Sequence, residues 1–212
     1  YGIVKVALGI YPIDALKKEI EGEEFNVGNS SFDIDEEIDF IRKNSAEISA
    51  ISEIGLDFVD SNEEEKASQV KLFRKMLDLA VELNLPAIVH TRKAEAEAVD
   101  IMKEYLARHK SLIIVLHCFM GKKKLIDECY RLGFYFSIPC NVVRAQNFQM
   151  TVSMVDINRL FIETDGPYMS PFKDTRNEPA FLIEAIKKIA ELKGMTEDEV
   201  IKNLYMNYQR IF

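Results

Sequence analysis

Short apolar runs alternate along the chain with longer stretches in which apolar residues recur at helical spacing. The short runs predict buried strands, and recurrence at i, i+3 and i+4 predicts helices that bury one face. The predicted strands are residues 1–9, 47–54, 86–90, 112–117, 134–138 and 159–164. The predicted helices are residues 14–20, 33–43, a long one capped by Asn62, 94–109, 122–132, 147–155, 179–193 and a last one that begins with a capping box of Thr196 and Glu199.

This alternation of strands and helices predicts an α/β fold with a parallel sheet. The 37 residues from Glu53 to His90 and the 27 from His90 to His117 each match about one strand–helix–strand unit. A chain of 212 residues is long enough to bury one full core. We therefore expect a single domain over residues 1–212.

Four of the predicted strands deliver a polar residue at or near their carboxyl ends: Glu53, His90, His117 and Asp165. In an open doubly wound sheet, ligands gather at one switch point that takes residues from two or three strands. In a TIM barrel the carboxyl ends of all strands meet at one mouth. No glycine-rich phosphate fingerprint follows any strand. The sequence therefore favours an α/β TIM (β/α)8 barrel.

The strand count is lower than this fold requires. Six strands are predicted, whereas a TIM barrel has eight and typically ~250 residues. The chain starts at Tyr1 rather than Met, and its first residues already read as a strand. We expect that the first one or two βα units of the barrel precede this chain.

Glu53, His90, His117 and Asp165 form a suitable ligand set for a divalent metal ion. An ion held there would lower the pKa of a bound water, and Asp165 could take up the water's proton. Each residue alone has an ordinary explanation. A single histidine is commonly hydrogen-bonded in a core, Glu53 could pair with a lysine, and Asp165 before Gly-Pro could make an Asx turn. Their occurrence together at the strand ends predicts a metal site.

Basic residues follow the same strands as these candidate ligands. They are either a solvated rim or a site that recognises phosphate groups. The residues concerned are Arg92, Lys93, Lys122–Lys124, Arg144, Lys173 and Arg176.

Composition excludes several classes of protein. A net charge of −8 argues against broad electrostatic binding of nucleic acid, although a local basic rim remains compatible with it. No apolar run approaches the roughly 18 residues of a membrane-spanning helix. The three cysteines show no CxxC spacing, which indicates a reducing compartment and a cytoplasmic protein rather than a disulfide framework.

Four sequence blocks resemble the signatures of the TatD family of metal-dependent deoxyribonucleases. They are Glu53-Ile54-Gly55-Leu56-Asp57-Phe58, His90-Thr91-Arg92, His117-Cys118-Phe119-Met120-Gly121 and Glu163-Thr164-Asp165-Gly166-Pro167-Tyr168. Asn177-Glu178-Pro179 and the segment from Leu192 to Phe212 are also similar to the family.

The resemblance implies an amidohydrolase-like TIM barrel that hydrolyses phosphodiester bonds in DNA, of the exonuclease type. It implies one or two divalent ions, for which zinc, magnesium and manganese are candidates. Glu53 would bridge two ions, His90 and His117 would hold one of them, and Asp165 would bind metal and handle the water proton. Glu53 and Asp165 are thus the catalytic candidates, and Arg92 and Tyr168 are candidates for binding the substrate.

The chain departs from the family pattern at its start. The family opens with a His-x-His on its first strand, and nothing here matches it. Tyr11 and Ile13 stand where the family often has two histidines. We therefore expect one divalent ion on the side of His90 and His117. Two alternatives remain: an amidohydrolase-like enzyme acting on a small amide or ester, and a barrel without catalytic activity.

Overall fold

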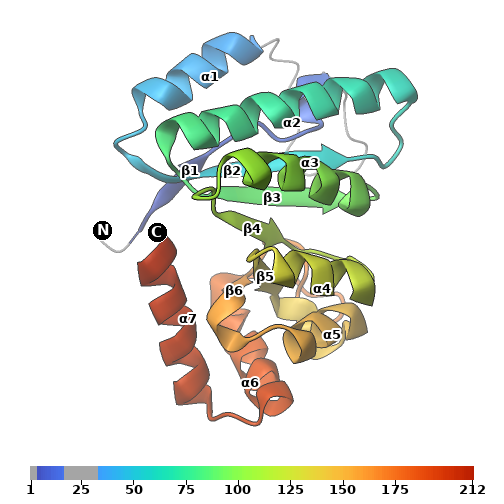
Figure 1. Cartoon of the computed structure of the whole chain (residues 1–212). Coiled ribbons are helices and arrows are strands. Elements are labelled where there is room, and N and C mark those ends of the chain that lie inside the picture. The colour runs from blue at the N-terminus through green and yellow to red at the C-terminus, as the bar shows by residue number, and fades with distance from the viewer. Residues whose placement is uncertain (1–3, 17–32) are drawn as a thin grey trace. The chain divides into compact units, whose positions relative to one another are not determined.

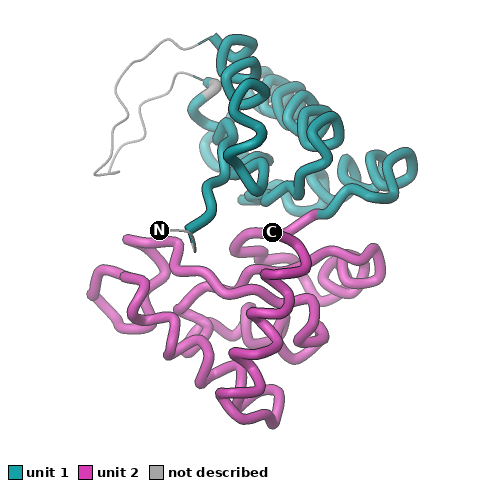
Figure 2. Tube along the Cα trace, turned by 90° about the vertical axis from the view of Figure 1, so that its left-hand side faces the viewer, with its two compact units in different colours: residues 1–113 teal, residues 114–212 magenta. Residues whose placement is uncertain are grey.

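The computed structural model describes residues 4–16 and 33–212, which form two compact units, residues 1–113 and 114–212 (Figure 2). The described part of the first unit contains three strands and three α-helices (Figure 1). Their bounds are β1 Val6–Leu8, α1 Ile34–Lys43, β2 Ile48–Asp57, α2 Glu63–Leu83, β3 Ala87–Arg92 and α3 Glu95–Arg108, with a 3-10 turn at Asp14–Leu16. Strand β2 pairs in parallel with β1 and with β3.

The second unit repeats the pattern with another run of parallel strands, in which β5 pairs with β4 and with β6. Its elements are β4 Ile114–His117, α4 Lys123–Arg131, β5 Tyr135–Pro139, α5 Gln146–Met154, β6 Leu160–Glu163, α6 Leu182–Lys193 and α7 Glu197–Ile211. Every residue of β4 and β5 is buried, as expected for parallel strands that are covered on both faces.

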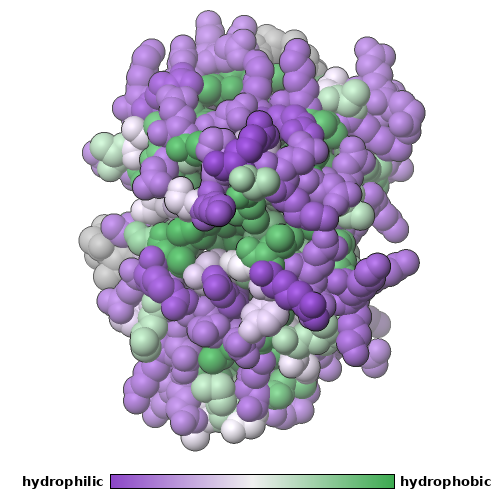
Figure 3. Space-filling model, viewed as in Figure 1, coloured by the Kyte–Doolittle hydropathy of each residue, from purple (hydrophilic) through white to green (hydrophobic). Residues whose placement is uncertain are grey.

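Each unit has a core that joins its strands to its helices. In the first unit, Ile54 and Leu56 of β2 and Phe73 and Leu77 of α2 are completely or almost completely buried. In the second unit the corresponding side chains come from the strands, α5 and α6; they are Leu116, Phe136, Leu160, Phe148, Val152 and Ile189. Polar residues cover most of the outward helix surfaces seen in Figure 3. These cores fix the strands whose carboxyl ends carry the candidate site.

A strand is found at each of the six predicted places, and most of the helix caps are confirmed. The first strand covers only Val6–Leu8 of the predicted range 1–9, of which residues 1–3 lie outside the described part. Asp33 accepts hydrogen bonds from the first turn of α1, and both Asn62 and Thr196 form the reciprocal capping box. The predicted helix over 14–20 is a 3-10 turn at Asp14–Leu16, and residues 17–20 lie outside the described part. The expectation of a single domain stays a prediction.

Two strands continue clearly past their predicted ends: β3 continues past His90 to Arg92, and β2 continues past residue 54. Strand β2 does not end near Glu53 but continues to Asp57, since Gly55 pairs with His90 and Asp57 with Arg92. The register shifts between Ile51 and Ile54, so Glu53 lies at an irregularity inside the strand. Such irregularities change the direction of side chains, and here the side chain concerned is the carboxylate of Glu53.

Gly55 is required by the close approach of β2 to β3. Its φ is +144°, and a Cβ atom at this position would lie 2.0 Å from the carbonyl oxygen of His90. A side chain there would push β3 away at the residue that carries a candidate ligand. Gly55 is therefore needed for β2 to pack against β3 beside His90.

We expect Gly55→Ala to destabilise the protein by roughly 3 kcal/mol or more, because overpacking and a strained φ act together. Gly194→Ala is the matched control, since Gly194 also has a positive φ (+63°) but has nothing within 4 Å of its Cβ position. Urea unfolding of both variants measures the difference. Equal losses of stability would show that the approach of β2 to β3 imposes no constraint.

Two further sequence expectations can be compared with the structure. Among the described helices, none combines the length and the apolarity that crossing a membrane demands. All three cysteines lie within residues 33–212, and none of them is in a disulfide.

Candidate metal centre

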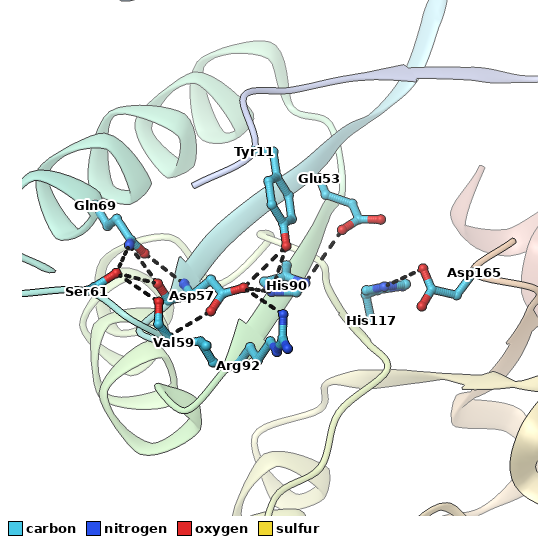
Figure 4. A network of polar contacts seen from close by, with 10 residues as sticks. All are labelled: Tyr11, Glu53, Asp57, Val59, Ser61, Gln69, His90, Arg92, His117 and Asp165. Carbon is cyan, nitrogen blue, oxygen red and sulfur yellow. Dashed lines mark hydrogen bonds and ion pairs between the residues drawn. The ribbon is translucent and has the colours of Figure 1, made fainter. Parts of the chain in front are cut away.

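In the first unit, polar side chains gather around His90 at the carboxyl end of β3. We call Tyr11, Glu53, Asp57, His90 and Arg92 the His90 cluster (Figure 4). Nδ1 of His90 lies 3.7 Å from Oε2 of Glu53, and Nε2 lies 3.4 Å from Oδ2 of Asp57. The imidazole therefore has one carboxylate on each side.

The hydroxyl of Tyr11 also belongs to this cluster. It lies 3.3 Å from Nε2 of His90 and donates to Oδ2 of Asp57 at 3.4 Å. The two rings meet edge to face, with centroids 4.9 Å apart. Tyr11 thus packs against the imidazole and shares its carboxylate partner.

In the second unit, a similar arrangement surrounds His117, the last residue of β4. The His117 cluster consists of His117, Cys118, Glu163 and Asp165. Nδ1 of His117 lies 2.7 Å from Oε2 of Glu163. Nε2 lies 3.6 Å from Oδ1 of Asp165, and Figure 4 shows these two side chains facing each other. The backbone N–H of Cys118 donates to the other oxygen of Glu163 at 2.9 Å.

A tight turn after β6 places Asp165. Its φ is +54°, in the left-handed region that Asp tolerates better than most residues. The buried side chain of Asn177 donates to the carbonyl of Thr164 at 2.6 Å, and the N–H of Tyr168 donates to the carbonyl of Asp165 at 2.8 Å. These bonds hold the backbone on both sides of the carboxylate, so its position is set by the fold.

Glu163 is ionised despite its burial. Burial alone would raise its pKa, but the charge of His117 and the hydrogen bonds from His117 and Cys118 lower it further than burial raises it. Glu163 is therefore an acceptor only, and Nδ1 of His117 is the donor in their short hydrogen bond. Burial alone would lower the pKa of His117, but the charge of Glu163 and the hydrogen bond to Asp165 raise it further, so without metal Nε2 carries a proton and donates toward Asp165. An ion bound at Nε2 would take the place of this proton.

Each cluster places one carboxylate oxygen and one imidazole nitrogen at a spacing that suits a divalent metal ion. Two ligand atoms about 2.1 Å from an ion at a tetrahedral angle lie about 3.4 Å apart. The separations of 3.7 Å for Glu53–His90 and 3.6 Å for His117–Asp165 are near this value and too long for good hydrogen bonds. In each case the second ring nitrogen faces another carboxylate, as ligating histidines commonly do. His117, Cys118 and Glu163 are also close enough to hold an ion between them.

The predicted site residues are therefore brought together in pairs. Glu53 lies beside His90, and His117 lies beside Asp165. Arg92 places Nη1 3.7 Å from Oδ2 of Asp57, and its side chain is 56% exposed. Tyr168 is half exposed on the turn that follows Asp165. That all four candidate ligands surround one ion stays a prediction.

Sequence reasoning gave no role to several residues of the two clusters. In the sequence, Asp57 and Glu163 stand out only as parts of longer motifs. Tyr11 stands out only as a departure from the family pattern. Gln69, which binds the backbone of Asp57, lies on a helix and gave no signal at all. The one usable signal was that apolar strands here end in acids, which are costly to bury without partners.

Comparisons with known proteins agree with this geometry. The model of the family of TatD-related DNases matches residues 1–212. An uncharacterized metal-dependent hydrolase, YabD of Bacillus subtilis, is 33% identical over 218 residues, covering 100% of this chain and 78% of that protein. A 3'-5' ssDNA/RNA exonuclease, TatD of Erwinia tasmaniensis, is 32% identical over 177 residues, covering 79% of this chain and 67% of that protein.

A solved structure supplies the fold. The crystal structure of YJJV, a TatD homolog from Escherichia coli, superposes with a TM-score of 0.81 at 24% sequence identity. The match covers 100% of this chain and 78% of that one. The likeness confirms the predicted α/β fold of the TIM-barrel class.

Proposed function

The chain belongs to the family of TatD-related DNases, and from this premise we propose that it is a metal-dependent hydrolase that cleaves phosphodiester bonds in DNA as an exonuclease. The observation that carries the proposal is the pair of carboxylate–histidine–carboxylate arrangements around His90 and His117. The names of the two relatives, a metal-dependent hydrolase and a nuclease of single-stranded DNA and RNA, support it.

We propose Glu53, His90, His117 and Asp165 as the metal ligands. In a TIM barrel the carboxyl ends of all strands open on one mouth, which supports a common role for residues of β2, β3, β4 and the turn after β6. Imidazole ligands favour a borderline ion such as zinc, while magnesium prefers oxygen ligands. A divalent ion supplies Lewis-acid activation of water and of the phosphate group.

The chain's own groups perform the remaining tasks. Asp165 has its carboxylate next to Nε2 of His117 and is the group that accepts the proton of the attacking water. Glu53 would share the ligand role, since its carboxylate lies 3.7 Å from Nδ1 of His90. Tyr168, half exposed two residues after Gly166, offers an aromatic face on which an unpaired base can stack.

The basic residues divide into two groups. Arg144 is used by the fold, because it donates to the carbonyl of Ser170 at 3.0 Å and so braces the loop after Tyr168. Arg92 is more than half exposed and keeps donors for a substrate phosphate. We also propose a location in the cytoplasm, which is compatible with the three cysteines outside disulfides.

We expect Arg92→Ala to raise KM for single-stranded DNA about tenfold, the scale of a lost charged hydrogen bond. The slope of log affinity against log salt should fall by about 0.7, because one fewer counterion is released. Lys103→Ala is the control, since Lys103 pairs with Asp100 on α3 at 3.2 Å. Equal effects of both variants would mean that Arg92 acts only through the general field.

The substrate class is tested with a panel. The proposal predicts that the protein, supplied with a divalent ion, releases nucleotides from DNA and leaves cyclic amides and lactones intact. Turnover of a lactone or amide without any action on DNA would contradict it and favour the amidohydrolase-like alternative.

A further inference from the structure

Asp57 is the most firmly held acidic residue of the His90 cluster. It is completely buried at the end of β2. The side chain of Gln69, also completely buried, accepts from its N–H at 2.8 Å and donates to its carbonyl at 2.6 Å. Gln69 also donates to the hydroxyl of Ser61 at 3.1 Å (Figure 4). Gln69 of helix α2 thus binds both the N–H and the carbonyl of Asp57.

The two carboxylate oxygens of Asp57 have different surroundings. Oδ1 accepts the backbone N–H of Val59 at 3.0 Å. Oδ2 faces three groups: the hydroxyl of Tyr11 at 3.4 Å, Nε2 of His90 at 3.4 Å and Nη1 of Arg92 at 3.7 Å. Figure 4 shows the three side chains converging on this oxygen. One buried atom therefore contacts both a candidate metal ligand and the candidate phosphate-binding arginine.

The contacts of the Asp57 carboxylate determine which ring nitrogen of His90 carries the proton. Oδ1 accepts the N–H of Val59, and Oδ2 faces the donor groups of Tyr11, His90 and Arg92, which is the arrangement that suits an ionised carboxylate. A carboxylate is an acceptor only, so Nε2 of a neutral His90 carries the proton. Nδ1 is then left with its lone pair on the side of Glu53, 3.7 Å away.

We propose that Asp57 is a positioning residue that holds His90 in the tautomer that binds metal through Nδ1 and at the same time holds the guanidinium of Arg92. The inference rests on the proposed metal and substrate roles of His90 and Arg92. Asp57 itself touches neither metal nor substrate in this scheme. Its carboxylate couples the two, because both lie against the same oxygen, Oδ2.

The variant Asp57→Asn tests this directly because it keeps the size of the side chain. The N–H of Val59 needs an acceptor, so the amide oxygen takes the place of Oδ1 and the NH₂ group replaces Oδ2. That NH₂ donates to Nε2 of His90 and moves the ring proton to Nδ1, the atom intended for the metal. A wrong tautomer of this origin is known to disable other histidine sites.

The readouts need neither nucleic acid nor turnover. On ¹⁵N-histidine-labelled, metal-free protein at about pH 8, NMR should report the Nε2–H tautomer for His90 in the native chain and Nδ1–H in Asp57→Asn. The affinity for zinc alone should fall by about 10- to 100-fold in the variant, as for other groups that orient a ligating histidine. Tyr11→Phe removes one donor but leaves the acceptor, and should retain both the tautomer and the affinity within about 3-fold.

Three outcomes overturn the inference. They are the Nδ1–H tautomer in the native chain, an unchanged tautomer in a folded Asp57→Asn variant, and unchanged zinc affinity in that variant. If Asp57→Asn fails to fold, the tautomer of His90 in the native chain still tests the inference. A failure of DNA cleavage would count against the proposed function and would leave these readouts unaffected.

Discussion

Replacing Asp165 by Asn should lower DNA hydrolysis by about 100-fold or more and leave the fold intact, because the proposed proton acceptor is lost while the size of the side chain is kept. Asn also tolerates the positive φ of +54° at this position. Steady-state hydrolysis of a labelled oligonucleotide measures the effect, and circular dichroism checks the fold.

Asp174→Asn is the matched control for this variant. Asp174 lies on the same loop, also has a φ of +54°, and its side chain is 85% exposed. It should hydrolyse DNA at the normal rate. Near-normal turnover by Asp165→Asn would remove Asp165 from the mechanism, whereas equal losses in both variants would indicate a structural role of the loop.

His117→Ala should abolish tight zinc binding and lower the free energy of unfolding by about 3 kcal/mol or more. The variant leaves the carboxylate of Glu163, only 17% exposed, without its 2.7 Å partner, and breaking a buried pair on one side costs about 3–5 kcal/mol. Zinc titration and urea unfolding measure the two effects separately.

A double-mutant cycle distinguishes the two roles of His117. In His117→Ala/Glu163→Gln the orphaned charge is gone, so we expect stability to return in part while zinc binding stays lost. Recovery of zinc binding in the double variant would show that His117 is not a ligand. Additive losses of stability would show that His117 and Glu163 do not form a coupled pair.

The fold was largely predictable because strands and helices here obey their hydrophobic periods. Apolar runs such as residues 112–117 leave few alternatives to a buried parallel strand, and Asn62 and Thr196 mark helix starts with a local hydrogen-bonding device. The end of β2 was missed because Glu53 reads as a strand terminator. The pairing of Gly55 with His90 outweighed that local signal, and it depends on contacts between segments far apart in sequence.

The candidate ligands were predictable from their places near strand ends, but the groups that orient them were not. Asp57 and Glu163 act through the second nitrogen of a histidine, and this relation is visible only once distances are known. Gln69 is seven residues into helix α2, where a buried glutamine gives no periodic signal. In the sequence Tyr11 is only a departure from the histidine of the family pattern. In the structure its hydroxyl contacts both Asp57 and His90.

The activity proposed for this protein is the metal-dependent hydrolysis of phosphodiester bonds in DNA. The most direct measurement starts from protein freed of metal by a chelator and follows nucleotide release from single-stranded DNA while zinc, manganese or magnesium is added back. We expect negligible release without metal and restored release with at least one of these ions, abolished in Asp165→Asn. Release that is equal with and without metal, or absent with every ion, would contradict it.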